Sequence, residues 1–372
     1  MREQYLLDDS VVFLNHGSFG ACPKPVFERY QAWQLELERQ PVEFLGRRHD
    51  TLIRDALATL GAFVGTSGEN LVFVPNATTG LNMVARSLDL STDDDILTTD
   101  HEYGALNLMW RYISQETGCT VKAMPLPEHF TNPDDVVEAI WQGVTERTKV
   151  LFLSHITSIT ALILPVAELC KRAREAGIIT IVDGAHVAGH LPLDLDALGA
   201  DFYSSNCHKW LSAPKGSAFV YVRPDYHALI DPLTISWWWD EKTLFERTRW
   251  QGTRDIAAFL TVPTAIQFQH DHDWWSIVAD CHQLALETGQ RIDALTGFAP
   301  LATPDFFMQM VAAELPSNTD MLALKTYLYD EHRVEIPLTE HGARKFVRVS
   351  IHAYNTRADA DALLAGLDEF YK

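Results

Sequence analysis

The sequence predicts an α/β protein with a mainly parallel sheet, followed by a smaller α+β domain. From about residue 70 to residue 222, short β-branched runs alternate with amphipathic helical stretches, an order that requires crossover connections between parallel strands. After Arg223 and Pro224 this alternation ends, and the rest of the chain has the pattern of one compact α+β unit. The composition, with 47% hydrophobic and 22% charged residues, is that of an ordinary globular protein.

Seven segments in the first part of the chain have the length and composition of strands. They are Leu71–Val74, Ile96–Thr98, Val121–Leu126, Val150–Ser154, Ile178–Val182, Asp201–Ser204 and Ala218–Val222. Helical patterns lie between several of them, and the one after Pro165 is the clearest. There Val166, Leu169 and Ala173 share one apolar face, and Gly177 is placed to end the helix. This alternation predicts a mainly parallel seven-stranded sheet covered on both faces.

Further elements are expected on both sides of the sheet region. The helical patterns Val26–Arg39 and Asp50–Val64 precede it, and a long helical segment is expected from about Thr261 to Asp293. The C-terminal unit then has the patterns of a strand, a helix, two strands and a helix: Phe306–Glu314, Asp320–His332, Val334–Pro337, Lys345–Ile351 and Arg357–Tyr371. We therefore expect a large domain over residues 17–255 and a small domain built from residues 1–16 and 256–372.

Charge and cysteine content limit the possible functions. With 30 basic and 50 acidic residues, the formal net charge of −20 argues against non-specific binding to nucleic acid or to anionic membranes. The 5 cysteines are widely spaced without a CxxC pair, which is typical of reduced thiols and not of a disulfide framework or zinc site. No signal peptide or membrane-spanning run is visible. We expect a soluble cytoplasmic protein with a small-molecule substrate and no metal, nucleic-acid or membrane partner.

Three polar segments follow predicted strands, where open α/β sheets place their ligands. Asp183 ends an apolar strand and is followed by His186; the alternative is a capping Asp with a surface histidine. Lys209 follows His208, and a partly buried lysine can lose its proton and act as a Schiff-base nucleophile, although most lysines are simply solvated. Residues 75–82 fit either a capping turn or an anion site for a phosphate at a helix N-terminus.

Taken together, these segments resemble pyridoxal 5'-phosphate (PLP) enzymes of fold type I, in the class V aminotransferase and cysteine desulfurase superfamily. In that family an Asp ends a strand, a Gln or His follows three residues later, and the lysine that binds PLP comes in a His-Lys pair. Asp183, His186 and the pair His208–Lys209 fit this order. The resemblance extends through nearly the whole chain, and further matching segments are 76–80, 101–103, 154–158, 251–253 and 348–356.

Within the superfamily, the chain is most similar to the isopenicillin N epimerase branch, which also contains carbon–sulfur lyases. The segments that carry this similarity are 13–20, 40–45, 206–211 and 250–255. One segment departs from it, because Ser158-Ile159-Thr160-Ala161 stands where relatives commonly have Ser-Pro-Thr-Gly. This departure concerns the substrate-side wall of the pocket and leaves the cofactor residues intact.

The resemblance implies the catalytic roles. It implies that Lys209 forms an imine with the cofactor and then acts as the base at the substrate α-carbon. Asp183 would keep the ring nitrogen protonated, so that the ring absorbs the electrons left on that carbon. His186 would contact the ring hydroxyl together with Ser158. Tyr103 or His101 would stack on the ring, and Tyr103 could also relay a proton.

The resemblance also implies how the cofactor and the substrate are held. The remaining cofactor-binding residues would be Asn76, Ala77, Thr78, Thr79, Asn206, His208 and, across a homodimer interface, Thr253 of the partner subunit. Substrate would be bound by Asn15, His16 and Arg348, whose planar guanidinium fits a carboxylate.

The reaction itself stays open among alternatives that share these residues. Returning the proton to the opposite face gives epimerisation, loss of a β-sulfur group gives a lyase, and protonation at the cofactor carbon gives transamination. A cysteine desulfurase needs a sulfur-accepting cysteine upstream of the carboxylate-binding arginine, and no cysteine lies between Cys281 and Arg348. We expect an epimerase-type enzyme acting at the α-carbon of an amino acid, with a cysteine-conjugate lyase and an aminotransferase as alternatives. A cofactor-free scaffold is disfavoured because both Lys209 and Asp183 are present.

Overall fold

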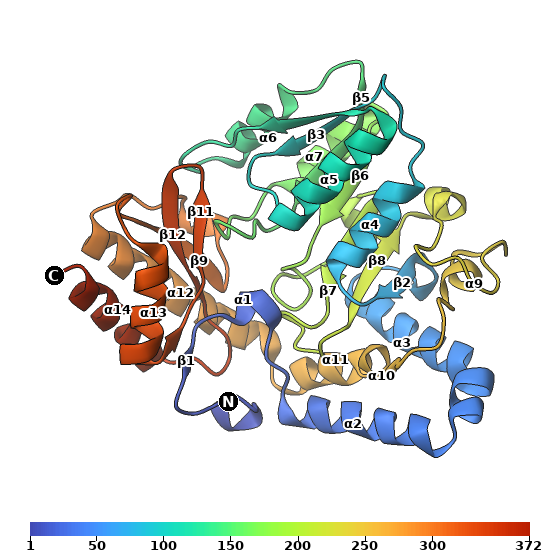
Figure 1. Cartoon of the computed structure of the whole chain (residues 1–372), viewed down its shortest axis with the longest axis horizontal. Coiled ribbons are helices and arrows are strands. Elements are labelled where there is room, and N and C mark those ends of the chain that lie inside the picture. The colour runs from blue at the N-terminus through green and yellow to red at the C-terminus, as the bar shows by residue number, and fades with distance from the viewer.

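A seven-stranded sheet of order β2-β8-β7-β6-β5-β3-β4 forms the centre of the computed structural model, which describes all 372 residues (Figure 1). Its strands are β2 (Leu71–Val74), β3 (Asp95–Thr99), β4 (Thr120–Met124), β5 (Thr148–Ser154), β6 (Ile179–Asp183), β7 (Phe202–Asn206) and β8 (Ala218–Val222). Only β8 runs antiparallel to its neighbours. The expected mainly parallel sheet of seven strands is confirmed, with shifts of one or two residues at some strand ends.

Helices cover both faces of this sheet, and the alternation of side chains along the strands explains why. On β5, Val150 and Phe152 pack into one hydrophobic cluster with α4 (Ala77–Ser87) and α5 (Gly104–Thr117). Leu151 and Leu153 point the other way, into the larger cluster that includes residues of α3 (His49–Phe63), α6 (Pro133–Trp141) and α7 (Val166–Glu175). Successive side chains of a strand face opposite sides, so one apolar run serves both layers.

The C-terminal part of the chain builds a second, three-stranded antiparallel sheet of order β11-β12-β9. Its strands are β9 (Met310–Leu315), β11 (Leu338–His341) and β12 (Arg344–Ser350), and the helices α12 (Trp274–Thr296), α13 (Met321–His332) and α14 (Arg357–Phe370) pack with it. The N-terminal strand β1 (Val12–Phe13) pairs with β10 (Val334–Glu335) in this region. In Figure 1, the short helix α1 (His16–Phe19) lies between the small sheet and the large one.

Two expected elements differ from the structure. The single helix expected from Thr261 to Asp293 is two helices, α11 (Val262–Asp271) and α12, because Asp273 adopts a left-handed φ of 48° between them. The strand expected from Phe306 begins only at Met310, after a helical turn that starts at Pro304.

Two helices that follow residue 255, and were expected in the small domain, pack on the large domain. The helices α10 (Ala257–Leu260) and α11 pack on α2 (Lys24–Arg39) and α3 of the large domain (Figure 1). Small-domain packing begins with α12, which lies against β9 and α14. The division at residue 255 therefore stays a prediction.

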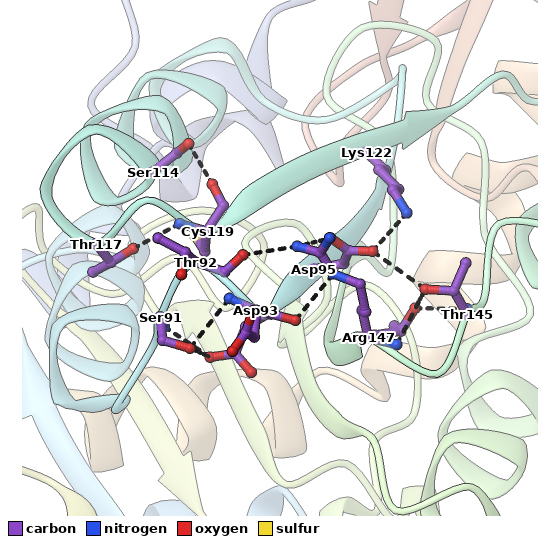
Figure 2. A network of polar contacts seen from close by, with 12 residues as sticks. Ser91, Thr92, Asp93, Asp95, Ser114, Thr117, Cys119, Lys122, Thr145 and Arg147 are labelled. Carbon is purple, nitrogen blue, oxygen red and sulfur yellow. Dashed lines mark hydrogen bonds and ion pairs between the residues drawn. The ribbon is translucent and has the colours of Figure 1, made fainter.

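A polar network joins the amino ends of the strands on the edge of the large sheet (Figure 2). The carboxylate of Asp95, which is 1% exposed, accepts from Lys122 Nζ at 2.5 Å and from Thr145 Oγ1 at 3.2 Å. Arg147 lies 3.5 Å from the same carboxylate and donates to the carbonyl oxygens of Thr92 and Asp93. The network ties β3 and β4 to the turn before β5 and leaves their carboxyl ends free for a site.

Two further observations concern the length of the helices and the state of the thiols. None of the helices has the length and apolar character needed to cross a membrane. All five cysteines are free, and four of them are buried.

Candidate active site

A cavity of about 380 Å³ lies at the carboxyl ends of the central strands. Ten of the residues expected at the site line it: Asn76, Ala77, Thr78, Tyr103, Ser158, Asp183, His186, Asn206, His208 and Lys209. They come from loops that follow β2, β3, β5, β6 and β7, because parallel strands end at the same edge of a sheet. The volume is typical of a pocket for a small organic molecule.

Lys209 lies in the turn after β7 and faces His186 across the cavity floor. Its Nζ is 3.2 Å from Nε2 of His186. Burial, together with the positive charge of Arg348, lowers the pKa of Lys209 to about 8. Burial also holds the pKa of His186 well below its ordinary value. A large fraction of Lys209 is therefore neutral near pH 8, which is the form that can attack an aldehyde.

Asp183 is the last residue of β6 and is buried beside the cavity. One of its oxygens accepts a hydrogen bond from the N–H of Ala185 at 2.9 Å, and no ion pair satisfies its charge. Burial raises the pKa of Asp183 to about 6. Gly184 allows the strand to end here, because a Cβ at this position would lie 2.1 Å from the ring of Tyr203. A buried carboxylate of this kind suits a cationic ring nitrogen.

The N-terminus of α4 forms the opposite end of the cavity. Asn76 caps the helix by accepting from the N–H of Thr79, and Thr79 Oγ1 also donates to this cap. The N–H of Ala77 donates to Asn206 at 2.9 Å, which joins this turn to the end of β7. Thr79 is thus committed to the cap, whereas Thr78 lines the cavity. The N–H groups of Ala77 and Thr79 are thus occupied, and the N–H of Thr78, which has no intrahelical partner, is the donor in this first turn that suits a phosphate.

The structure distinguishes Tyr103 from His101. Tyr103 lines the cavity and is 44% exposed. His101 points away from it: its Nδ1 lies 2.8 Å from Asp100, and its ring packs 4.1 Å from that of His341. Tyr103 is therefore the aromatic side chain that can lie against a ligand ring.

Arg348 on β12 reaches the edge of the cavity from the small domain. It is 4% exposed, donates to the backbone and side-chain oxygens of Ser158 and to Ser18 Oγ, and forms no ion pair. Burial lowers the pKa of Arg348 to about 10, which still leaves it charged at neutral pH. A buried guanidinium without an acidic partner fits a substrate carboxylate.

Besides Thr79, His101 and Arg348, three more expected residues, Asn15, His16 and Thr253, do not line the cavity. Asn15 donates to Glu335, and His16 is buried behind the cavity, where its Nε2 donates to the carbonyl oxygen of Lys209 and Tyr354 donates to its Nδ1. These contacts position the wall of the pocket and leave neither residue free for a substrate. Thr253 is exposed on a loop away from the cavity of its own chain.

Sequence reasoning missed one buried acid beside the site. Glu102 is fully buried and accepts hydrogen bonds from Thr99 and from Ser154, a residue that lines the cavity. Burial raises the pKa of Glu102 to about 7. The only signal in the sequence was its place between His101 and Tyr103, directly after a buried strand.

The residues in the cavity fit PLP. A lysine with a lowered pKa, a buried acid, a helix N-terminus and an aromatic ring surround one space of suitable size. These are the groups that PLP enzymes need for the aldehyde, the ring nitrogen, the phosphate and the ring face of the cofactor.

Comparison with known proteins agrees with this geometry. The sequence model described as aminotransferase class V matches residues 21–363. Isopenicillin N epimerase of Amycolatopsis lactamdurans is 35% identical over 100% of this chain and 98% of its own. A probable chloroplastic L-cysteine desulfhydrase of Arabidopsis thaliana is 27% identical over 95% of this chain and 81% of its own. A solved variant of C-DES with glycine covalently linked to its PLP cofactor superimposes with a TM-score of 0.88 at 22% identity, covering 99% of both chains. This likeness confirms the fold type I architecture.

Proposed function

Because the chain belongs to the class V aminotransferase family of PLP-dependent enzymes, we propose that it epimerises an amino-acid substrate at the α-carbon. One observation carries the proposal: Lys209 and the buried Asp183 line one cavity, and the guanidinium of Arg348 lies directly behind Ser158 and Ser18 in its wall. A base, an acid for the ring nitrogen and a carboxylate anchor thus converge on one space. The similarity to an epimerase over the full chain supports this choice of reaction.

Different residues would bind the phosphate, the ring and the substrate carboxylate. The first turn of α4, with Ala77 and Thr78, would hold the phosphate together with Asn206 and His208. Tyr103 would lie against the ring, and Asp183 would keep its nitrogen protonated. When bound, PLP supplies an electron sink for the pair left on the α-carbon. Arg348 would orient the substrate through its carboxylate, so that the α-hydrogen meets the amine of Lys209.

The placement of two proton-carrying groups supports epimerisation in particular. Lys209 follows β7 and Tyr103 follows β3, and in the sheet order β6, which carries Asp183, lies between these strands. Lys209 and Tyr103 therefore approach the cavity from opposite flanks. Removing a proton on one flank and returning one from the other inverts the α-carbon.

Carbon–sulfur β-elimination is the second candidate, and the similarity to a plant L-cysteine desulfhydrase favours it. The same base and the same anchor would serve this reaction, since it also begins with loss of the α-proton. Transamination is a third outcome that shares this first step.

The deciding experiment incubates the PLP-loaded protein with single enantiomers of amino acids and cysteine conjugates in deuterated water. Epimerisation predicts deuterium at the α-carbon and the appearance of the opposite enantiomer on chiral chromatography. Pyruvate with sulfide or a thiol would instead establish the lyase, and a keto acid with aminated cofactor would establish the aminotransferase. If the parent protein exchanged the α-proton of every substrate no faster than the Lys209→Ala variant does, the whole proposal would be contradicted.

We further propose a cytoplasmic homodimer in which Thr253 of the partner subunit completes the phosphate end of the cavity. Thr253 is exposed and lies outside the cavity of its own chain. Earlier in the chain, Trp237, Trp238 and Trp239 are 72%, 43% and 46% exposed, an aromatic surface typical of an interface. The five free thiols agree with a reducing compartment.

A further inference from the structure

Trp210 directly follows Lys209, and its indole determines where His186 carries its proton. Trp210 is fully buried, and its Nε1 lies 3.3 Å from Nδ1 of His186. An indole N–H can donate a hydrogen bond but cannot accept one, so Nδ1 must be the acceptor and carries no hydrogen. Burial holds the pKa of His186 well below its ordinary value, so the ring is neutral. Its single proton therefore lies on Nε2.

This tautomer has a consequence for Lys209. Nε2 of His186 is 3.2 Å from Nζ of Lys209, and an N–H on Nε2 has to donate toward that nitrogen. An ammonium group has three donors and no lone pair, so it would oppose this N–H. A neutral amine has a lone pair and accepts the hydrogen bond.

We propose that Trp210 is a positioning residue that holds His186 in the Nε2–H tautomer and so favours the unprotonated form of the Lys209 amine, oriented toward His186. This inference deepens the proposed function and rests on it for the importance of Lys209 as the reactive amine. It assigns a role to a side chain that touches neither the cavity nor its ligands.

The orientation of the indole is itself secured by a second histidine with a fixed tautomer. The ring of His190 stacks on Trp210 at 3.9 Å with an interplanar angle of 19°. Its Nδ1 lies 2.8 Å from the carbonyl oxygen of His186 and must donate, whereas its Nε2 accepts from the backbone N–H of Gln309 at 2.9 Å. Gln309 precedes β9, so the small domain helps to hold the indole in place.

Other charged groups near Lys209 act without contacting its amine. Burial disfavours the ammonium form most, Arg348 disfavours it further, and the opposing effect of Asp183 is smaller, so the pKa of Lys209 is lowered to about 8. The buried His16 contacts only the carbonyl oxygen of Lys209. A change at Trp210 touches neither Arg348 nor Asp183, although the ring of His16 lies 5.0 Å from the indole and loses part of that packing.

The first test reads the tautomer directly. Nitrogen-15 spectra of the histidine-labelled full-length chain, freed of PLP, distinguish a protonated from an unprotonated ring nitrogen. We expect His186 to show a protonated Nε2 and a bare Nδ1, assigned by comparison with His186→Gln. A protonated Nδ1 at His186 would overturn the proposal, whatever the enzyme catalyses.

The second test removes the indole N–H that faces Nδ1 of His186. Trp210→Phe keeps an aromatic ring against His190 but removes the N–H, so that Nε2 of His186 can accept from an ammonium and favour the charged lysine. We expect the pH midpoint for carbamylation of Lys209 by cyanate, followed by peptide mass spectrometry, to rise by about one unit. Trp274→Phe is the matched control, because its buried indole donates only to the carbonyl oxygen of Gly189, and it should keep the parental midpoint.

Equal midpoints in Trp210→Phe and Trp274→Phe would contradict the proposal. Circular dichroism checks that both variants fold, and if Trp210→Phe does not, the spectrum of the parent decides alone. Neither readout requires turnover. An inactive parent with a protonated Nε2 would therefore count against the proposed function and leave the tautomer assignment standing.

Discussion

Asp183 and Lys209 are titratable side chains that line one cavity, and the buried Arg348 contacts Ser158 and Ser18 in its wall. Keeping such groups from water costs free energy unless a partner of opposite charge or a hydrogen bond compensates for it. Burial accordingly raises the pKa of Asp183 to about 6 and lowers that of Lys209 to about 8. Each shift moves the group toward its neutral form, and a bound cofactor and an amino-acid carboxylate would supply the missing partners.

Replacing Asp183 by Asn should leave the protein folded and reduce α-proton exchange about 10²-fold or more, because a neutral amide cannot hold a proton on the ring nitrogen. Exchange into deuterated water, followed by mass spectrometry, measures the effect. Exchange at the parental rate in Asp183→Asn would show that this carboxylate has no part in the electron sink.

Replacing Arg348 by Lys should raise KM for the amino acid about tenfold with a smaller change in kcat, because a single ammonium cannot reproduce the two parallel hydrogen bonds of a guanidinium. Arg344→Lys is the matched control on the same strand, where Arg344 pairs with Glu314 away from the cavity. An equal KM in both variants would remove Arg348 from the substrate site.

The turn after the short helix α1 lies so close to the backbone of His208 that no side-chain atom fits between them. After α1 the chain turns at Gly20, whose φ is 72°, and a Cβ there would lie 1.9 Å from the carbonyl oxygen of His208. The turn at Gly20 therefore lies directly on the loop that carries Lys209. The residues around Gly20 do not indicate this close contact, because it forms between two segments that are distant in the sequence.

Gly20→Ala should displace the loop of Lys209 and weaken PLP binding by about tenfold, in addition to lowering the melting temperature. The control is Gly177→Ala, which has the same φ of 72° but no atom within 4 Å of the added Cβ. That variant should show only the cost of left-handed backbone, about 1–2 kcal/mol, with unchanged PLP affinity by titration. Equal PLP affinity in the two variants would argue against the contact with His208.

The network at the amino ends of β3 and β4 predicts a pH dependence of stability (Figure 2). The hydrogen bond from Lys122 lowers the pKa of Asp95, so the charged form stabilises the fold. This contribution is complete above the unfolded-state pKa of about 3.9 and is lost as the pH falls through the lower folded-state value.

Asp95→Asn should therefore reduce the free energy of unfolding by about 1–3 kcal/mol at pH 7, and the difference from the parent should shrink toward zero at strongly acidic pH. Urea unfolding at several pH values measures it. Asp93→Asn, at an exposed neighbour in the same network of loops, serves as the control and should show little change at any pH. A difference that is independent of pH would contradict the assignment to the charge of Asp95.

At the scale of the whole molecule, the small domain and the large sheet share the site. Arg348 crosses from β12 to Ser158, Gln309 supports His190, and His341 on β11 lies 3.2 Å from Asp100 after β3. Movement of the small domain would therefore change both the carboxylate anchor and the support of Trp210. A second subunit would add a third contribution through Thr253.

Mixing Lys209→Ala with Thr253→Ala chains tests that contribution. In a mixed dimer, one cavity would carry both substitutions and the other would have Lys209 and the partner's Thr253 intact. Random mixing should thus restore roughly a quarter of the parental sites. Lys209→Ala mixed with Asp183→Asn is the control, because both changes fall in cavities of their own chains and no intact site can form. Recovery no greater than in this control, or a monomer by sedimentation, would contradict the shared site.

The sequence alone determined the seven strands of the large sheet and most of the helices, whereas β1 and β11 were not expected from it. A strand can be recognised from the apolar pattern of a few consecutive residues. Asp183, Asn206 and the turn after Leu71–Val74 lie at the carboxyl ends of strands, and these ends share one edge of the large sheet. Strand ends alone left a capping or solvated role open for each group, and the resemblance to fold type I PLP enzymes combined them into one expected site.

Only the tertiary structure decided which neighbouring side chain faces the cavity and how each is held. His101 contacts Asp100 and His341 and points away from the cavity, so that Tyr103 is the aromatic residue at the site. Both ring nitrogens of His16 are hydrogen-bonded, to Tyr354 and to the carbonyl oxygen of Lys209. The donor that faces Nδ1 of His186, the indole N–H of Trp210, is likewise brought there only by folding. Local pattern sets the period of an element, but a side chain's direction and tautomer are set by the donors and acceptors that folding brings beside it.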